Sequence, residues 1–428
     1  RLPLPSRADA PEADPDQTEA FLVTRQTGLG RLAAGDVPYP FSRTRELLAP
    51  HAAGLEPVID LTLGEPRETM PGFVAEKIKE AEALFKKYPP INGYPELRGA
   101  IASWIQRRYG VAIDAEGEIL PSNGSREGLF FAALLAVGRK PMVAGKQPAI
   151  LMCNPYYAAY IGAALATNAE PVYLNATATT GYLPDLEKLA ADEELLGRTA
   201  ALYLCSPANP QGTAASADYT ARALELARQH DFMLFFDECY SEIYNDAPPV
   251  GGLEVAARTN RGFENLVVFN SLSKRSNVPG LRSGFTAGDS AFLKRLTGIR
   301  NLIGPQMPGP TQMASAAIWA EERHVTFNRL AYKRKFDVCD AVLEGRYGYR
   351  RPDGGFFLWL DVTHFGGGVD TTVTLWKRAG VRVLPGAFLA QPDRFGENPG
   401  EDFIRAALVA ETDAIKVALE RITSVLSQ

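Results

Sequence analysis

Short apolar runs recur along the middle of the chain, and longer segments of helical periodicity separate them. The runs are PAILMC (148–153), EPVYLN (170–175), AALYLCS (200–206), FMLFFD (232–237), NLVVFN (265–270) and SGFTAG (283–288). Strands that are apolar on both faces and alternate with amphipathic helices form a mostly parallel sheet with helices on both sides. The pattern over residues 57–305 therefore predicts an α/β fold.

The pattern changes after the proline-rich loop GPQMPGPTQ (304–312). Apolar positions at 3.6-residue spacing predict a long helix over about residues 311–345. Three further runs indicate strands of a smaller α+β unit, and an amphipathic segment predicts its closing helix. These segments are GGFFLWLDV (354–362), VRVLPG (381–386), DFIRAALVA (402–410) and ETDAIKVALERITSVL (411–426).

We therefore expect two domains after an N-terminal arm. Residues 1–20 are rich in proline, alanine and charge and lack periodicity, which predicts a mobile arm. Residues 21–56 are expected to be the N-terminal part of a small domain, residues 57–310 a large domain, and residues 311–428 the C-terminal part of the small one. A chain of 428 residues with 46% hydrophobic residues is long enough for two cores.

Charge and cysteine usage exclude several classes of protein. The chain has 45 basic and 50 acidic residues and no long basic tract, which argues against nucleic-acid and anionic-membrane partners. No apolar run reaches the roughly 18 residues of a membrane span, and the N-terminus lacks the pattern of a secretion signal. The four cysteines lie far apart without a C-x-x-C pair, so we expect reduced thiols, no metal site and a soluble cytoplasmic protein.

Polar side chains follow three of the predicted strands at the point where each strand ends. They are Asn209 in LCSPANPQGT, Asp237 and Tyr240 in FFDECYSEIY, and Ser271, Ser273 and Lys274 in FNSLSKR. Ligands of open parallel sheets bind at the carboxyl ends of the strands, so we expect one shared site. Taken singly, each residue also has a simpler interpretation as a turn former, a helix cap or a half-buried aromatic side chain. A carboxylate at the end of an apolar strand nevertheless needs a partner.

The surroundings of Lys274 indicate a bound anion. Arg275 and Arg282 flank this lysine together with hydroxyl groups, although surface lysines usually have acidic neighbours. The anion that these cations and hydroxyls would bind is absent from the sequence, so we expect it to be a ligand.

Several motifs together resemble one family. They are NP-x-G (209–212), DECY (237–240), SLSK (271–274), an arginine eight residues after Lys274, LPG-x-F (384–388) and F-x-R (403–405). Their order and spacing, over essentially the whole chain after residue 55, resemble those of the class I/II aminotransferases of the fold-type I pyridoxal phosphate enzymes. The resemblance implies a large domain with a mostly parallel, seven-stranded type of sheet flanked by helices, a smaller α+β domain, and pyridoxal 5'-phosphate as cofactor.

The resemblance also implies roles for the residues at the strand ends. Lys274 would form the imine with the cofactor aldehyde and later carry the proton from the substrate Cα, as a neutral amine whose pKa the neighbouring arginines lower. Asp237 would pair with the pyridine nitrogen, and Tyr240 and Asn209 would bind the phenolic oxygen. The aromatic residue that stacks on the ring would be Tyr157, with Tyr156 as the weaker candidate.

Further residues would hold the phosphate and the substrate. The phosphate would contact Arg282, Ser271, Ser273 and the N-terminal amides of a helix at Gly124, Ser125 and Arg126, although NGS alone also fits a plain helix cap. Tyr88 matches a tyrosine that reaches a phosphate from a second subunit, which implies a homodimer with shared active sites. Arg405, with Gly64 and Asn209 beside it, would hold the α-carboxylate.

Within the family, the strings LPSNGSREGLFFA, CSPANPQG, DECYSEIY and SLSKRSNVPGLRSGF are most similar to the N-succinyl-L,L-diaminopimelate aminotransferases. Those enzymes of lysine biosynthesis take the amino group from glutamate. The distal negative charge of such a substrate requires a second cation, for which Arg300 and Arg126 are candidates. An aminotransferase for aspartate, aromatic or other amino acids, a pyridoxal phosphate lyase and a regulator with this fold remain alternatives.

Overall fold

A seven-stranded sheet forms the centre of the computed structural model, which describes residues 27–37 and 39–427. In sheet order its strands are β2 (Ile119–Ser122), β8 (Gly284–Gly288), β7 (Leu266–Ser271), β6 (Met233–Asp237), β5 (Thr199–Cys205), β3 (Ala149–Asn154) and β4 (Glu170–Asn175). Neighbouring strands from β7 to β4 are parallel, and β8 is antiparallel to both β7 and β2. The prediction of a mostly parallel sheet is confirmed. Strand β2 was not predicted, because its four residues include a proline, which an edge strand tolerates.

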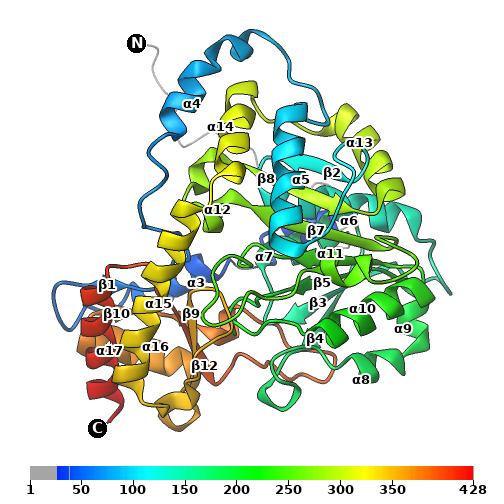
Figure 1. Cartoon of the computed structure of the whole chain (residues 1–428). Helices are drawn as coiled ribbons and strands as arrows, with labels where there is room; N and C mark the ends of the chain where they lie inside the picture. The colour runs from blue at the N-terminus through cyan, green and yellow to red at the C-terminus, as the bar shows by residue number, and fades with distance from the viewer. Residues whose placement is uncertain (1–26, 38, 428) are drawn as a thin grey trace, which may run out of the picture.

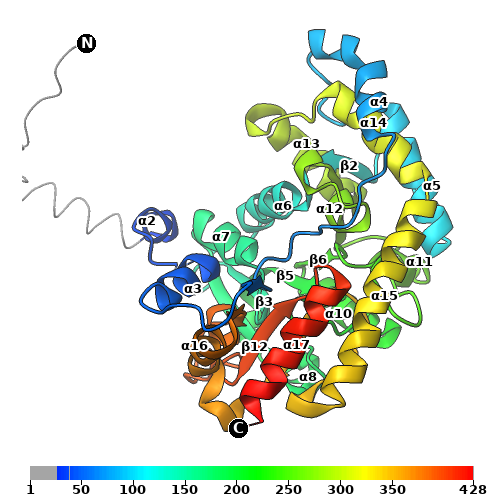
Figure 2. The same cartoon turned by 90° about the vertical axis from the view of Figure 1, so that its left-hand side faces the viewer.

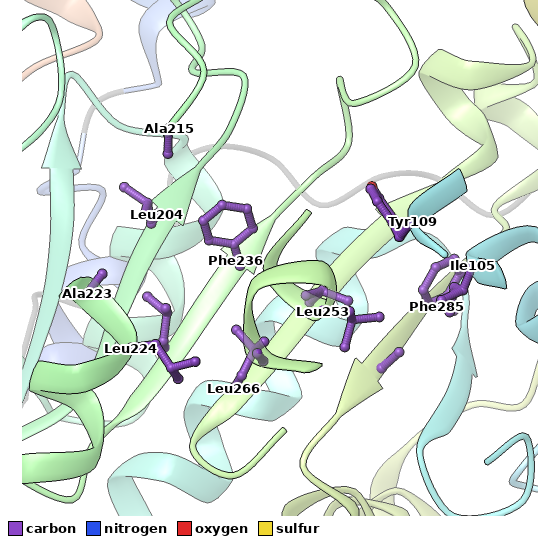
Figure 3. Packing of buried hydrophobic residues seen from close by; sticks show 14 of the residues in the cluster. Ile105, Tyr109, Leu204, Ala215, Ala223, Leu224, Phe236, Leu253, Leu266 and Phe285 are labelled. Atoms are coloured by element: carbon purple, nitrogen blue, oxygen red, sulfur yellow. The ribbon is translucent and has the colours of Figure 1, made fainter. Parts of the chain in front are cut away.

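Helices cover both faces of this sheet (Figure 1). The first face carries α6 (Ser125–Arg139), α7 (Ala158–Ala166) and α13 (Ser290–Ile303). The second face carries α5 (Pro95–Tyr109), α8 (Leu186–Ala190), α9 (Glu193–Arg198), α10 (Ala217–Gln229), α11 (Gly252–Ala257) and α14 (Gly309–Ala320). Along β6, Phe235 lies in the core of the first face and Phe236 in the core of the second, as the two-residue period of a strand requires. Figure 3 shows Phe236 beside Leu204 of the neighbouring strand β5, with which it is in register.

A smaller unit lies at the lower left of Figure 1. Its antiparallel sheet has the order β11 (Leu384–Pro385), β12 (Phe403–Ala407), β9 (Phe357–Asp361), and β1 (Ile59–Asp60) pairs in parallel with β10 (Val381–Arg382). Its helices are α15 (Arg323–Leu343), α16 (Gly367–Ala379) and α17 (Thr412–Leu426). Three further helices, α2 (Gly28–Ala33), α3 (Pro40–Leu48) and α4 (Val74–Glu80), precede the large sheet, and the short α12 (Leu272–Arg275) follows β7. None of the described helices combines the length and the hydropathy needed to cross a membrane.

The tract predicted as one helix over residues 311–345 is two helices, α14 and α15. The Glu321 carboxylate accepts hydrogen bonds from the backbone N–H groups of Arg323, at 2.9 Å, and His324, at 3.1 Å, and so caps the start of α15. Trp319 of α14 is buried in the core of the large sheet. The division at residues 56/57 and 310/311 stays a prediction, although β1 joins the smaller sheet and α14 packs on the larger one. The predicted arm, residues 1–20, lies outside the described residues.

Candidate active site

Parallel pairing brings the polar strand ends to one edge of the sheet. Cys205 of β5 lies opposite Asp237 of β6, which lies opposite Phe269 of β7. Asn209 follows β5, and Lys274 belongs to the short helix α12 directly after β7. The structure thus brings the residues of the three predicted strand ends to one location.

The Lys274 amine lies in a mostly buried position. Its Nζ donates a hydrogen bond to the Gly64 carbonyl oxygen and lies 5.5 Å from the centre of the Phe356 ring. The pKa of Lys274 is lowered to about 8, mainly by burial and to a smaller extent by Arg405 and Arg282. The sequence predicted the arginines as the cause of a lowered pKa, but removal of the amine from water is the larger effect.

Asp237 is buried, and its carboxylate accepts hydrogen bonds from other residues of the chain. Its Oδ2 accepts a hydrogen bond from the Tyr160 hydroxyl at 2.7 Å, and its Oδ1 accepts one from the Cys239 N–H at 3.2 Å. Burial raises the pKa of Asp237 above its ordinary value, and these hydrogen bonds oppose that rise. The Tyr160 ring stacks on Tyr203 at 4.3 Å. Tyr160 was not among the site residues predicted from the sequence, although it stands three residues after Tyr157, on the same face of a helix.

We expect Tyr160→Phe to lower kcat by about tenfold, because a hydrogen bond to a charged acceptor such as the Asp237 carboxylate contributes roughly 1.5–3 kcal/mol. Steady-state kinetics of the enzyme saturated with cofactor would measure this loss. Tyr203→Phe is the matched control, since its hydroxyl donates to the Leu129 carbonyl at 2.7 Å and not to Asp237. Equal losses in the two variants would contradict a specific role for Tyr160.

The first turn of α6 and the loop after β7 form a cradle for an anion. Gly124 caps the helix with φ +82, and a Cβ there would lie only 2.5 Å from Nη2 of Arg282. The guanidinium of Arg282, an exposed residue, donates to the carbonyls of Pro279, at 2.9 Å, and Asn123, at 3.2 Å. A Cβ on Gly284 would lie 2.9 Å from the Ser125 nitrogen, so the helix start and the paired strands are in contact.

Hydroxyl groups also line this cradle. The Ser271 Oγ lies 2.8 Å from the Ser273 Oγ, and the Ser125 Oγ accepts a hydrogen bond from the Cys239 thiol at 3.1 Å. Together with the helix N-terminus and the guanidinium of Arg282, these groups suit a phosphate.

A buried arginine from the smaller sheet completes the site. Arg405 of β12 donates to the Asn209 Oδ1 at 3.3 Å and to the Thr62 carbonyl at 2.5 Å, and it lies 4.5 Å from the centre of the Phe357 ring. Burial lowers the pKa of Arg405 to about 10. Among the described residues no carboxylate pairs with it, and its buried Nε has no hydrogen-bond partner. Such a cation favours an anionic ligand.

Aromatic side chains surround the other residues of the site. The Tyr240 ring is buried and lies 5.4 Å from the Phe356 ring centre. Tyr157 lies at the start of α7, 5.6 Å from the Tyr160 ring, and its hydroxyl accepts a hydrogen bond from the Arg126 Nε at 2.8 Å. The Tyr156 hydroxyl instead accepts a hydrogen bond from Gln391 at 3.2 Å, and the stacking of Tyr157 on the ring stays a prediction.

The burial and contacts of Arg300 argue against the substrate-binding role predicted for it. Its buried guanidinium donates to the Glu127 carboxylate of α6 at 2.7 Å and to the Pro121 carbonyl at 2.7 Å. Because Glu127 neutralises it, this cation joins α13 to α6 and β2 and is not available to a second carboxylate. The residue before Glu127, Arg126, is exposed and remains a candidate. Tyr88 is 97% exposed, so the single chain does not bring it to the site.

Comparison with known proteins identifies the family. The family model for aminotransferase class I and II matches residues 56–422. The chain belongs to the class I and II aminotransferases. A crystal structure of an aminotransferase from Neisseria meningitidis is similar to it, with a TM-score of 0.85, 39% identity and coverage of 90% of this chain and 97% of that one.

Curated relatives of this aminotransferase act on different substrates by their names. The LL-diaminopimelate aminotransferase of Desulforudis audaxviator is 29% identical and covers 91% of this chain and 96% of its own. The 4-dedimethylamino-4-oxo-anhydrotetracycline transaminase of Streptomyces rimosus is 31% identical and covers 91% of this chain and 98% of its own. Family membership therefore establishes the reaction type, and the substrate requires a separate argument.

The aminotransferase depends on pyridoxal 5'-phosphate, as its family does. The residues present fit this cofactor in two respects. A side chain at position 124 would fill the cradle, and because Gly124 has none, a phosphate can approach the backbone closely there. The buried Asp237 carboxylate and the Lys274 amine are the two groups that the pyridine nitrogen and the aldehyde require.

Proposed function

We propose that this aminotransferase transfers the amino group of glutamate to the 2-oxo acid that corresponds to N-succinyl-L,L-diaminopimelate, which yields 2-oxoglutarate and N-succinyl-L,L-diaminopimelate, or catalyses the reverse reaction, as a step of lysine biosynthesis in the cytoplasm. Two cations carry the proposal. Arg405 is buried and has no carboxylate partner among the described residues, and Arg126 is a second, exposed cation. Relatives named LL-diaminopimelate aminotransferase in several organisms support a long dicarboxylic amino acid as substrate. Aspartate, a shorter dicarboxylic amino acid that Arg405 and a second cation would also suit, is the second candidate.

In this proposal each residue of the site has one task. Pyridoxal phosphate, when bound, supplies an aldehyde that takes the amino group and a ring that accepts the electrons left at Cα. Lys274 moves the proton to and from the substrate Cα, for which an amine with a pKa of about 8 is suited near neutral pH. Asp237 keeps a proton on the ring nitrogen, and Arg405 orients the α-carboxylate. The same residues serve both half-reactions.

Residues 39–41, at the start of α3, lie where we expect the distal part of the substrate to bind. Tyr39, the residue before α3, forms a side-chain hydrogen bond with Arg126. The Phe41 ring is 5.2 Å from Tyr39 and 5.9 Å from the Arg405 guanidinium. Tyr39 and Phe41 therefore connect the surroundings of Arg126 and Arg405, and a substrate with carboxylates at both ends would match two cations placed in this way.

Arg126→Ala is expected to raise KM for N-succinyl-L,L-diaminopimelate and glutamate by about tenfold and to leave alanine unaffected, since one charge-assisted hydrogen bond is lost. The measurement is a panel of amino donors and acceptors that includes N-succinylated diaminopimelate, free L,L-diaminopimelate and aspartate with 2-oxoglutarate. Absence of turnover on the succinylated compound, with good turnover on aspartate, would overturn the assignment of the substrate.

Arg300→Ala is the control for this panel. Its loss leaves the Glu127 carboxylate partly buried and unpaired, so the free energy of unfolding should fall by roughly 3 kcal/mol. Residual activity of that variant should decrease equally for alanine and glutamate. A selective loss for the dicarboxylic substrate would restore the substrate role that the sequence predicted for Arg300.

We further propose a homodimer with shared active sites. Large apolar side chains remain exposed on the single chain: Tyr88 97%, Leu302 83%, Phe85 64% and Ile303 59%. Exposed apolar groups of this size favour burial against another surface. A second copy would bring Tyr88 to a neighbouring phosphate cradle.

A further inference from the structure

An extended segment crosses the molecule between α3 and α4 (Figure 2). Residues 61–70 of this segment, which we call the strap, contain no helix or strand. Two of its backbone carbonyls contact Arg405 and Lys274 of the active site. The Thr62 oxygen accepts a hydrogen bond from Arg405 at 2.5 Å, and the Gly64 oxygen accepts one from Lys274. The position of the strap therefore affects where both cations lie.

Side chains hold the strap at its two ends. At the start, the N–H of Thr62 donates to the Asp60 carboxylate at 2.8 Å. At the far end, the Glu68 carboxylate lies 2.5 Å from the Lys335 amine of α15, and Asn277 donates to the Thr69 carbonyl at 3.3 Å. The side chain of Lys335 is only 2% exposed and that of Glu68 is 19% exposed.

The Glu68–Lys335 ion pair lies next to two stacked aromatic rings, those of Tyr332 and Phe356. The Lys335 Nζ is 4.9 Å from the centre of the Tyr332 ring, which stacks on Phe356 at 5.1 Å. Phe356 is the ring that the Lys274 Nζ approaches to 5.5 Å. A buried ion pair adds little net stability compared with an apolar pair of the same volume. Stability alone is therefore a weak account of this pair.

We propose that the Glu68–Lys335 ion pair is a latch that fixes the position of the strap. The strap in turn holds the Arg405 and Lys274 side chains in the positions that bind the amino-acid substrate. Glu68 and Lys335 are positioning residues that act through the Thr62 and Gly64 carbonyls. With the latch broken, binding of substrate must also order the strap, and affinity falls. Chemistry in the bound complex changes less, because Lys274 and Asp237 remain. The inference rests on the proposed role of Arg405.

The test compares Glu68→Gln and Lys335→Met with Lys333→Met in the cofactor-loaded enzyme. Lys333 belongs to the same helix but makes an exposed pair with Asp337 at 3.5 Å. We expect KM for glutamate and Kd for maleate, a dicarboxylate that does not react, to rise about tenfold in the two latch variants, with kcat changed less than about threefold. Lys333→Met should leave all three constants unchanged.

Two conservative variants keep the test decisive if a latch variant does not fold. Lys335→Arg retains the pair and should restore the original KM, whereas Glu68→Asp shortens the contact and should raise KM and Kd severalfold. A lower Tm with unchanged KM and Kd would show a purely structural pair and overturn the proposal. A fall in kcat at unchanged KM would overturn it as well.

Arg405→Lys separates the latch from the role of Arg405 itself. Weaker binding of maleate in Arg405→Lys together with wild-type binding in Glu68→Gln would overturn the latch alone. Unchanged binding of maleate in Arg405→Lys would overturn the proposed role of Arg405, and the latch proposal with it.

Discussion

Lys274→Ala is expected to abolish transamination, with kcat lowered by at least about 10⁴-fold, because the variant lacks both the attachment point of the cofactor and the base. Lys274→Arg should be equally inactive, since a guanidinium stays protonated and cannot accept the Cα proton. The measurement is a single turnover with glutamate, followed by the visible absorbance of the cofactor. Borohydride should attach the cofactor covalently to the wild-type chain and not to Lys274→Ala; covalent attachment in the variant would contradict the assignment.

The pH dependence of cofactor uptake tests the same amine. Only the neutral amine reacts with an aldehyde, so uptake by the cofactor-free protein should rise with pH and level off above about 8, the pKa of Lys274. At pH 7 a pKa of about 8 leaves roughly one amine in ten neutral, against about 3 in 10⁴ for an ordinary lysine. An inflection near the ordinary value would show that burial does not shift this lysine.

Asp237→Asn is expected to lower kcat by about 10³-fold. The amide keeps the shape of the side chain but removes the charge that holds a proton on the ring nitrogen, and a buried charge-assisted contact of this kind contributes several kcal/mol to a transition state. Steady-state kinetics with glutamate and 2-oxoglutarate, together with the measured cofactor content, would separate loss of chemistry from loss of cofactor.

The neighbouring carboxylate provides the matched control for Asp237→Asn. Glu238 is also buried, but its oxygens accept hydrogen bonds from the Tyr109 hydroxyl at 2.6 Å and the Gly252 N–H at 2.7 Å, away from the site. Glu238→Gln should therefore change kcat by less than about fivefold. A loss in Asp237→Asn no larger than that in Glu238→Gln would contradict the role of Asp237.

Local sequence predicted the residues that follow strands in the site. Asp237 and Lys274 come directly after apolar runs, and parallel pairing of those runs necessarily places their carboxyl ends together. The apolar runs did not predict the order of the strands in the sheet or the antiparallel pairing of β8 with β7 and β2. The periodicity within a run does not specify which run is its neighbour.

Side-chain partners from distant segments could not be read in the same way. The sequence analysis placed Arg300 at the substrate because it did not show that Glu127, 173 positions away, neutralises it. It missed Tyr160 because a hydroxyl reveals its acceptor only when helix α7 and strand β6 are packed together. The same holds for Glu68 and Lys335, which are separated by 267 positions.

The sequence by itself determined the alternation of strands and helices, the family and the groups at the strand ends, because these depend on contacts and spacings within a few residues. Tertiary structure alone decided which charges are neutralised, how far burial lowers the pKa of Lys274, and where the strap is held. Burial and pairing depend on segments that meet only after the chain has folded, and no local pattern encodes them.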